Sequence, residues 1–170
     1  MLTKKFIKKI ESYIKKHLKE PQGKCSKSFR HIKAMTVVNG YVCIDYFSPE
    51  EFERMRQKLR EVFPEYFLSA VSHSGLTESE ICKKAHLDRR IFSKLRERQN
   101  YLPRKRTIIK TAVALELELN HVRFLLRCAG CPLSQFNRED VILRFLFENR
   151  IFDWSLINDV LNHFGFKGLI

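Results

Sequence analysis

The chain has 170 residues, a length that fits one domain or a small domain with an appendage. Apolar residues make up 44% and include 14 Phe, which is enough to build a core, while 6 Gly and 5 Pro exclude collagen-like and low-complexity chains. No apolar stretch approaches the length of a membrane span, and no long apolar run follows the basic N-terminus. We therefore expect neither a membrane segment nor a secretion signal.

The net charge of +13 is concentrated in two segments. Residues 1–35, the first basic zone, hold eleven Lys and Arg against two Glu. Residues 83–110, the second basic zone, hold eleven Lys and Arg against one Asp and one Glu. Such concentration is typical of binding surfaces for nucleic acid, acidic proteins or anionic membranes, although lysine-rich helix faces can also be merely solvated.

The odd, scattered set of cysteines favours reduced thiols and hence a cytoplasmic protein; its members are Cys25, Cys43, Cys82, Cys128 and Cys131. The spacing of Cys128 and Cys131 suits a metal site, but zinc needs four ligands and no second pair exists. No Gly-rich phosphate loop, nucleophile elbow or catalytic carboxylate pair is present. We expect a binding protein without metal or cofactor, rather than an enzyme.

A first helix is predicted from about Thr3, its cap, to Leu18. One face carries the apolar stripe Phe6, Ile7, Ile10, Ile14 and Leu18. The other face carries the lysines Lys4, Lys5, Lys8, Lys9, Lys15 and Lys16. The stripe is narrow and lacks Trp, so docking on the protein's own core or on a second copy is favoured over a membrane surface.

A β-hairpin is predicted between Ala34 and Phe47, because β-branched and aromatic residues surround the turn-forming pair Asn39-Gly40. Ser48 and Pro49 then start a helix, which we expect to end or break at Pro64. Its expected buried face consists of Phe52, Met55, Leu59 and Val62. A further helix over residues 65–73 is predicted to stop at Ser74-Gly75.

The rest of the chain is predicted to be helical. Thr77 and Glu80 form a capping box for a helix that ends near His86, and Asp88 caps a helix over residues 89–98. Four more helices are predicted over residues 104–117, 120–129, 138–149 and 154–163, with Asn120 and Asp153 as caps.

Two short helices joined by a tight turn between Thr77 and Arg98 form a helix-turn-helix arrangement. The apolar residues that would lock the two helices together are Ile81, Ala85, Leu87, Ile91 and Leu95. The residues left to face outward are Arg89, Arg90, Ser93, Lys94, Glu97 and Arg98.

The stretch from Leu76 to Leu95 reads LTESEICKKAHLDRRIFSKL and resembles the phage-repressor-like (Xre-type) helix-turn-helix family. The resemblance covers about residues 64–130, although His86 stands where the family usually has Gly. It implies a mainly α fold: a five-helix repressor-like bundle plus two C-terminal helices, with the N-terminal helix and hairpin as an appendage. The expected division is residues 1–63 and 64–170. Residues 64–170 also resemble a module found in uncharacterised bacterial proteins.

The resemblance places base-reading side chains at Arg89, Arg90 and Lys94, with Ser93 beside them. It also implies contacts with the DNA backbone by Thr77, Arg98, Tyr101, Arg104, Lys105 and Arg106. In addition, the first basic zone would contribute sequence-independent phosphate affinity.

The last two helices carry more apolar surface than such helices usually bury, including Phe145, Phe147, Trp154 and Phe166. They could complete the core of the bundle, or they could form the interface of a homodimer that presents two recognition helices to DNA.

The sequence thus predicts a bacterial or phage transcriptional regulator that binds specific double-stranded DNA. The alternative is a phage-type inhibitor, similar to anti-CRISPR proteins, whose basic surfaces bind a protein or a guide-RNA complex. A third possibility is RNA binding through the lysine-rich first helix.

Overall fold

The computed structural model describes residues 2–20, 32–38, 41–47, 49–97 and 101–170. This part of the chain is mainly α, as expected, with one two-stranded hairpin. The elements are α1 (Lys4–His17), β1 (Ile32–Val38), β2 (Tyr41–Phe47), α2 (Pro49–His73), α3 (Glu78–Ala85), α4 (Arg90–Glu97), α5 (Lys105–Ala114), α6 (Leu119–Cys128), α7 (Arg138–Glu148) and α8 (Trp154–His163). Among the helices of these segments, none is long and apolar enough to cross a membrane.

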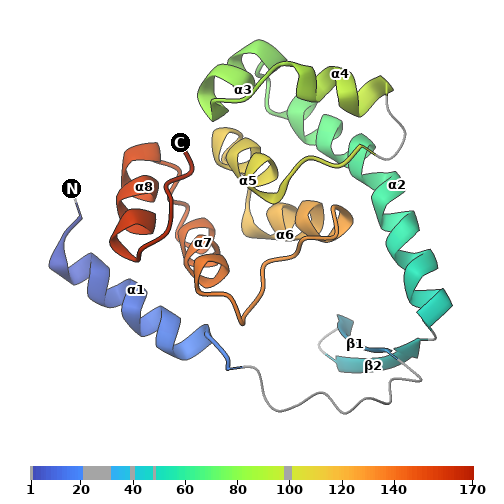
Figure 1. Ribbon diagram of the computed structural model, residues 1–170, viewed down its shortest axis with the longest axis horizontal. Helices are drawn as coiled ribbons and strands as arrows, with labels where there is room; N and C mark the ends of the chain where they lie inside the picture. Colours follow the sequence, from blue (N-terminus) through green and yellow to red (C-terminus); the bar gives the residue numbers. More distant parts are fainter. Residues whose placement is uncertain (1, 21–31, 39–40, 48, 98–100) are drawn as a thin grey trace.

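The core lies between the second half of α2 and helices α3 to α8 (Figure 1). Fully buried side chains come from helices far apart in the sequence, among them Phe67 in α2, Ile108 in α5, Leu125 in α6 and Leu146 in α7. At about 25 cal/mol per Å² of apolar surface removed from water, this burial is the main stabilising contribution to the fold.

Helix α1 docks on the same core, which confirms the predicted docking of its apolar stripe on the protein's own body. Thr3 caps the helix by accepting a hydrogen bond from the Phe6 amide (3.3 Å). Ile10 and Ile14 are buried, and the Tyr13 hydroxyl donates to Glu148 Oε2 (2.5 Å) on α7. Residues before the predicted boundary at 63/64 therefore share a core with residues after it.

The expected helix break at Pro64 is wrong, because α2 continues through it and the boundary at 63/64 lies inside this helix. A proline inside a helix costs about 3 kcal/mol through its missing hydrogen bond and its steric clash. Phe63 and Phe67 lie one turn apart on either side of Pro64, and both are buried, with ring centroids 5.6 Å apart. Burying two Phe side chains stabilises the continuous helix by about 3–6 kcal/mol, which offsets this cost.

The expected buried face of the first half of α2 is wrong at Met55 and Val62, whereas Leu59 is half-buried against the core as predicted. Met55 is 38% exposed and Val62 is 43% exposed, whereas Phe63 is buried. Consecutive helix residues point about 100° apart, so burial of Phe63 turns Val62 toward solvent. The N-terminal half of α2 projects beyond the bundle (Figure 1). The side chain of Phe52 lies outside the described part.

The predicted hairpin is present, with β1 antiparallel to β2 and Val38 paired with Tyr41. That register leaves the two-residue connection that the sequence predicted, although Asn39-Gly40 itself lies outside the described residues.

Most predicted helix ends are confirmed, with two corrections. Helix α5 ends at Ala114, three residues before the predicted end at Leu117, and Glu116 has a φ of 53. Asn137 and Asp153 cap α7 and α8, and Gly75, Gly130 and Gly165 follow helix ends with positive φ. Helix α6, however, begins at Leu119 with Glu118 in the cap position, two residues before the predicted cap. The Glu118 carboxylate forms an ion pair with Arg150 instead of capping the helix, so no local side-chain signal marks this start.

Candidate nucleic-acid interface

A short left-handed turn joins α3 to α4. His86 has φ 50 and ψ 54, and the Leu87 amide donates to the Cys82 carbonyl (2.9 Å). Asp88 Oδ1 then accepts from the Arg90 amide (2.9 Å), as the sequence predicted for a cap. This connection allows the chain to reverse with very few residues and fixes where α4 begins.

The apolar faces of α3 and α4 hold the pair against the core. Ile81 and Ala85 of α3 are fully buried. Three residues of α4 are almost fully buried as well: Ile91, Phe92 and Leu95. The small Ala85 side chain leaves room for close helix approach, and the Phe92 ring lies 6.2 Å from that of Phe67 in α2. Burial of these faces therefore determines which side of α4 points outward.

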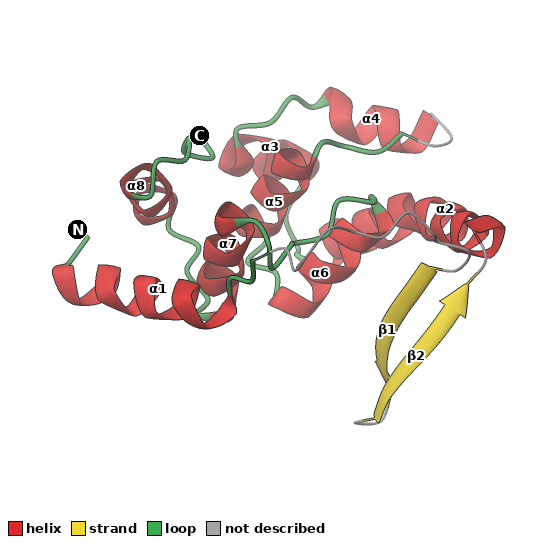
Figure 2. Ribbon diagram, turned by 60° about the horizontal axis from the view of Figure 1, so that its bottom comes forward, coloured by secondary structure: helices red, strands yellow, loops and turns green. Residues whose placement is uncertain are grey.

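The outward face of α4 is basic and lies at the edge of the molecule. Arg89, Arg90 and Ser93 are exposed, and 81% of the Arg90 side chain is accessible. Lys94 is half-buried, with Nζ 5.7 Å from the centre of the Tyr101 ring. Figures 1 and 2 both show α4 at the side of the molecule opposite the hairpin. The structure thus brings four of the predicted base-reading and neighbouring residues onto one accessible surface.

Two of these side chains have weak intramolecular partners. Arg89 Nη2 donates to Ser79 Oγ (2.7 Å), and Arg90 Nε lies 3.5 Å from Asp88 Oδ2. Exposed ion pairs such as Arg90–Asp88 contribute only about 0–1 kcal/mol, and the Arg89–Ser79 hydrogen bond is also exposed, so a polyanion could displace both contacts. Arg96, which the site prediction did not include, pairs with Glu78 on α3 and lies one turn from Ser93 and two turns from Arg89. Its helical spacing from Arg89 was the available signal.

The expected phosphate contact at Thr77 has competing partners. The Thr77 amide and hydroxyl both donate to Glu80 Oε2, at 2.7 and 2.6 Å, in the capping box that the sequence predicted. Those hydrogen bonds from Thr77 hold the pKa of Glu80 below its usual value. With Glu78 and Glu80 in its first turn, the N-terminus of α3 carries negative charge where a phosphate would have to bind.

Lys105 and Arg106 both have carboxylate and carbonyl partners within the chain. Lys105 Nζ lies 2.7 Å from both carboxylate oxygens of the buried Asp140. Arg106 Nη1 lies 3.3 Å from Glu139, and its Nη2 donates to the carbonyl of Lys167 (3.0 Å) near the C-terminus. Both cations tie α5 to α7 and to the end of the chain, and their side chains remain 29% and 41% exposed, so a contact with DNA would have to compete with these intramolecular partners.

Of the remaining predicted contacts, Arg104 is exposed at the start of α5 and Tyr101 is half-buried beneath Lys94. Arg98 lies outside the described residues. In the first basic zone, all six predicted lysines are exposed on α1: Lys4, Lys5, Lys8, Lys9, Lys15 and Lys16.

The cysteines show no sign of a metal or redox centre in the described segments. Cys82 and Cys128 are buried, and burial raises the pKa of their thiols and of the Cys131 thiol. No group of three or more His, Cys, Asp or Glu within these segments is arranged to hold a metal ion.

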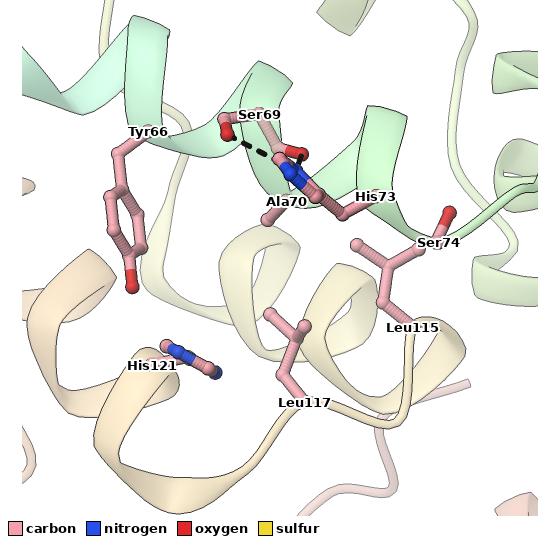
Figure 3. A pocket seen from close by; sticks show the side chains of 8 residues that line it. All are labelled: Tyr66, Ser69, Ala70, His73, Ser74, Leu115, Leu117 and His121. Atoms are coloured by element: carbon pink, nitrogen blue, oxygen red, sulfur yellow. Dashed lines mark hydrogen bonds between the residues drawn. The ribbon is translucent and has the colours of Figure 1, made fainter.

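A separate pocket of about 460 Å³ lies between the second half of α2 and the segment that leads from α5 into α6 (Figure 3). It is lined by Tyr66, Ser69, Ala70, His73, Ser74, Leu115, Leu117 and His121. His73 Nδ1 lies 2.7 Å from the carbonyl of Ser69, one turn earlier in α2, and this contact holds the His73 ring in place. The lining contains no Lys, Arg, Asp or Glu, and the pocket is therefore distinct from the basic surface.

The C-terminal helices bury most of their apolar residues within the chain. Phe145 and Phe147 of α7 and Val160 and Leu161 of α8 are buried, whereas Ile170 is 45% exposed. The apolar surface that suggested a dimer is thus largely used in the core.

Comparison of the chain with protein-family models, with curated proteins and with solved structures found no match.

Proposed function

We propose that this protein binds specific double-stranded DNA through a repressor-like helix-turn-helix and acts as a transcriptional regulator. In this proposal the second half of α2 and helices α3 to α6 form the five-helix unit. Helix α3 supports α4, and α4 enters the major groove. The proposal is carried by one observation: α4 buries Ile91, Phe92 and Leu95 and turns a basic, accessible face to the edge of the molecule. A helix of this kind fits the groove of B-form DNA.

The side chains on this face suit recognition of base edges. Arg89 and Arg90 could each form a bidentate pair with guanine, worth about 1–3 kcal/mol of discrimination. Glu97, exposed one turn beyond Ser93, could accept a hydrogen bond from the cytosine amino group. A face that combines donors with one acceptor favours sequence reading over purely electrostatic binding.

Phosphate contacts in the proposal come from residues with accessible charge or hydroxyl groups. Arg104 and Tyr101 lie beside α4 at the start of α5, and Lys83 is exposed on α3. Thr77, Lys105 and Arg106 are left out because their polar groups have intramolecular partners. No dimer is included, because α7 and α8 bury most of their apolar surface within one chain.

Selection from random duplex DNA at physiological salt tests the proposal. The expected result is enrichment of a defined sequence by the wild-type protein, and loss of that enrichment for the double variant R89A/R90A. Lys58→Ala, at an exposed lysine of α2, is the matched control and should enrich the same sequence. If the wild-type protein enriches nothing, specific regulation is excluded.

A second candidate function is inhibition of a protein or ribonucleoprotein target, as in anti-CRISPR proteins. The observation in its favour is the projecting half of α2, where Met55 and Val62 are exposed beside basic residues. Apolar side chains within a charged surface are typical of protein interfaces. Recovery of one protein partner after nuclease treatment, lost in the variant M55E/V62E, would favour this function over DNA binding.

A further inference from the structure

Helix α1 presents a dense lysine face, which we define as Lys4, Lys5, Lys8, Lys15 and Lys16. All five are exposed, and within the described residues no carboxylate lies at ion-pair distance from any of them. Glu11 is the one acidic residue in the helix. The face therefore carries a strong net positive charge along the length of α1, reduced only by Glu11, one turn from Lys8 and Lys15.

The packing of α1 fixes the direction of this lysine face. Ile10 and Ile14 are buried, and Lys9 Nζ donates to Asn149 Oδ1 (3.0 Å) at the end of α7. At about 100° per residue, Lys5 and Lys8 stand roughly opposite Ile10 around the helix. The lysine face consequently points away from the body of the protein and cannot rotate inward without exposing the isoleucines.

The same packing decides between two classes of polyanion. A membrane-surface helix inserts its apolar stripe among the lipids, but the stripe of α1 is occupied by contacts with α7. A row of lysines along a rigid helix without an available apolar side matches instead the regular phosphates of a nucleic-acid duplex, to which each lysine adds sequence-independent affinity.

The lysine face and the outward face of α4 lie at opposite edges of the molecule. Figures 1 and 2, viewed 60° apart, both place α1 and α4 on different sides of the bundle, with α5, α6 and α7 between them. A straight duplex lying on α4 would leave the lysine face accessible. We propose that the lysine face of α1 binds a second segment of double-stranded DNA, so that one chain bridges two duplexes. This inference rests on the proposed function for the first duplex only.

A two-duplex capture assay tests the bridging. A duplex of the selected sequence is fixed to beads and loaded with protein, and retention of a labelled duplex of random sequence is measured. The variant K5Q/K8Q/K15Q should reduce retention of the second duplex by about tenfold or more, because three phosphate contacts are lost. It should keep the wild-type circular dichroism spectrum, since these side chains make no core contact.

The matched control removes the same number of charges elsewhere, at exposed positions outside both basic zones. The variant R54Q/K58Q/R127Q should retain the second duplex as the wild type does. Equal loss in both triple variants would overturn the proposal, because net charge alone would then explain capture. Unchanged capture by K5Q/K8Q/K15Q would overturn it too, because two α4 faces in a dimer would then suffice.

Two further results separate the inference from the proposed function. R90A should lose its preference for the selected sequence. On random duplex, the slope of log affinity against log salt concentration should be the same for R90A as for the wild type, whereas K5Q/K8Q/K15Q should reduce the magnitude of this slope by about 3. If selection enriches nothing but this slope difference remains, the proposed function fails and the α1 contact stands. Binding of wild-type protein to phosphatidylserine vesicles that duplex DNA does not displace would assign α1 to a membrane and overturn the inference.

Discussion

Arg90 and Arg106 belong to the same basic zone and have different environments. The Arg90 side chain is 81% exposed beside Asp88, whereas Arg106 bonds to Glu139 and to backbone carbonyls near the C-terminus. The cost of removing Arg90 from its exposed partner is small, since such pairs are worth about 0–1 kcal/mol. Only Arg90 is therefore available to a ligand without disturbing the fold.

Substitution of Arg90 should change specificity more than stability. Arg90→Ala is expected to lower discrimination between the selected duplex and its single-base variants by about 1–3 kcal/mol, with the free energy of unfolding unchanged. Fluorescence titrations with the selected and scrambled duplexes measure this difference. An equal loss of affinity for both duplexes would show that Arg90 contacts only phosphate.

Asp140 should contribute to stability instead of DNA binding. It is buried and accepts from Lys105 Nζ (2.7 Å) and from the Ser134 amide (2.8 Å). Asp140→Ala leaves both donors without this partner and should lower the free energy of unfolding by about 2–3 kcal/mol in urea titrations. Lys105→Ala should leave DNA affinity unchanged when measured below its unfolding transition. If Lys105→Ala bound DNA more weakly while still fully folded, the phosphate contact predicted for Lys105 from the sequence would be supported.

At the level of elements, α3 and α4 are joined by a turn whose central residue is not the usual glycine. His86 adopts φ 50, a conformation that costs a non-glycine residue about 1–2 kcal/mol. His86→Gly should raise the free energy of unfolding by about 0.5–1 kcal/mol, while the β-branched His86→Val should lower it. Thermal unfolding of both variants is the measurement. A destabilised glycine variant would mean that the His86 ring, 6.4 Å from that of Trp154, makes the larger contribution.

The capping box of α3 predicts a pH dependence. Hydrogen bonds from the Thr77 side chain and backbone lower the pKa of Glu80 from its usual 4.5. Because the pKa is lower in the folded state, the stabilisation is present above pH 4.5 and is lost as the pH falls through the folded-state pKa. Thr77→Ala should raise the pKa of Glu80 in an NMR carboxyl titration. An unchanged pKa would contradict the capping contribution.

The elements that could be predicted from the sequence are those with local signals. Thr77, Glu80 and Asp88 act within a few residues of their own positions, so the ends of α3 and the start of α4 were predictable. The start of α6 was not, because Glu118 pairs with Arg150, 32 residues away.

The candidate site divides in the same way. Helical periodicity identifies the outward residues Arg89, Arg90 and Ser93, which the structure leaves exposed. Periodicity does not identify which cations find carboxylates elsewhere in the chain, so the ion pairs of Lys105 and Arg106 with α7 were not predictable. It also does not show which half of a helix meets the bundle, and for that reason Met55 was expected to be buried.

At the level of the whole molecule, the lysine face of α1 and the outward face of α4 are separate surfaces on one core. Helix α1 packs on α7, and α4 buries Phe92 against Phe67 of α2, so their charged faces are held in fixed directions. A protein of this shape could contact more than one nucleic-acid segment. We propose that the outward face of α4 is the surface that reads base edges.

The most direct test of that claim is an amide chemical-shift map of the labelled protein on addition of one equivalent of the selected duplex, at a salt concentration that suppresses non-specific contacts. We expect the largest changes at Arg89, Arg90, Ser93 and Lys94, and smaller changes at Arg104. Changes that are confined to the projecting half of α2, with α4 unaffected, would contradict it.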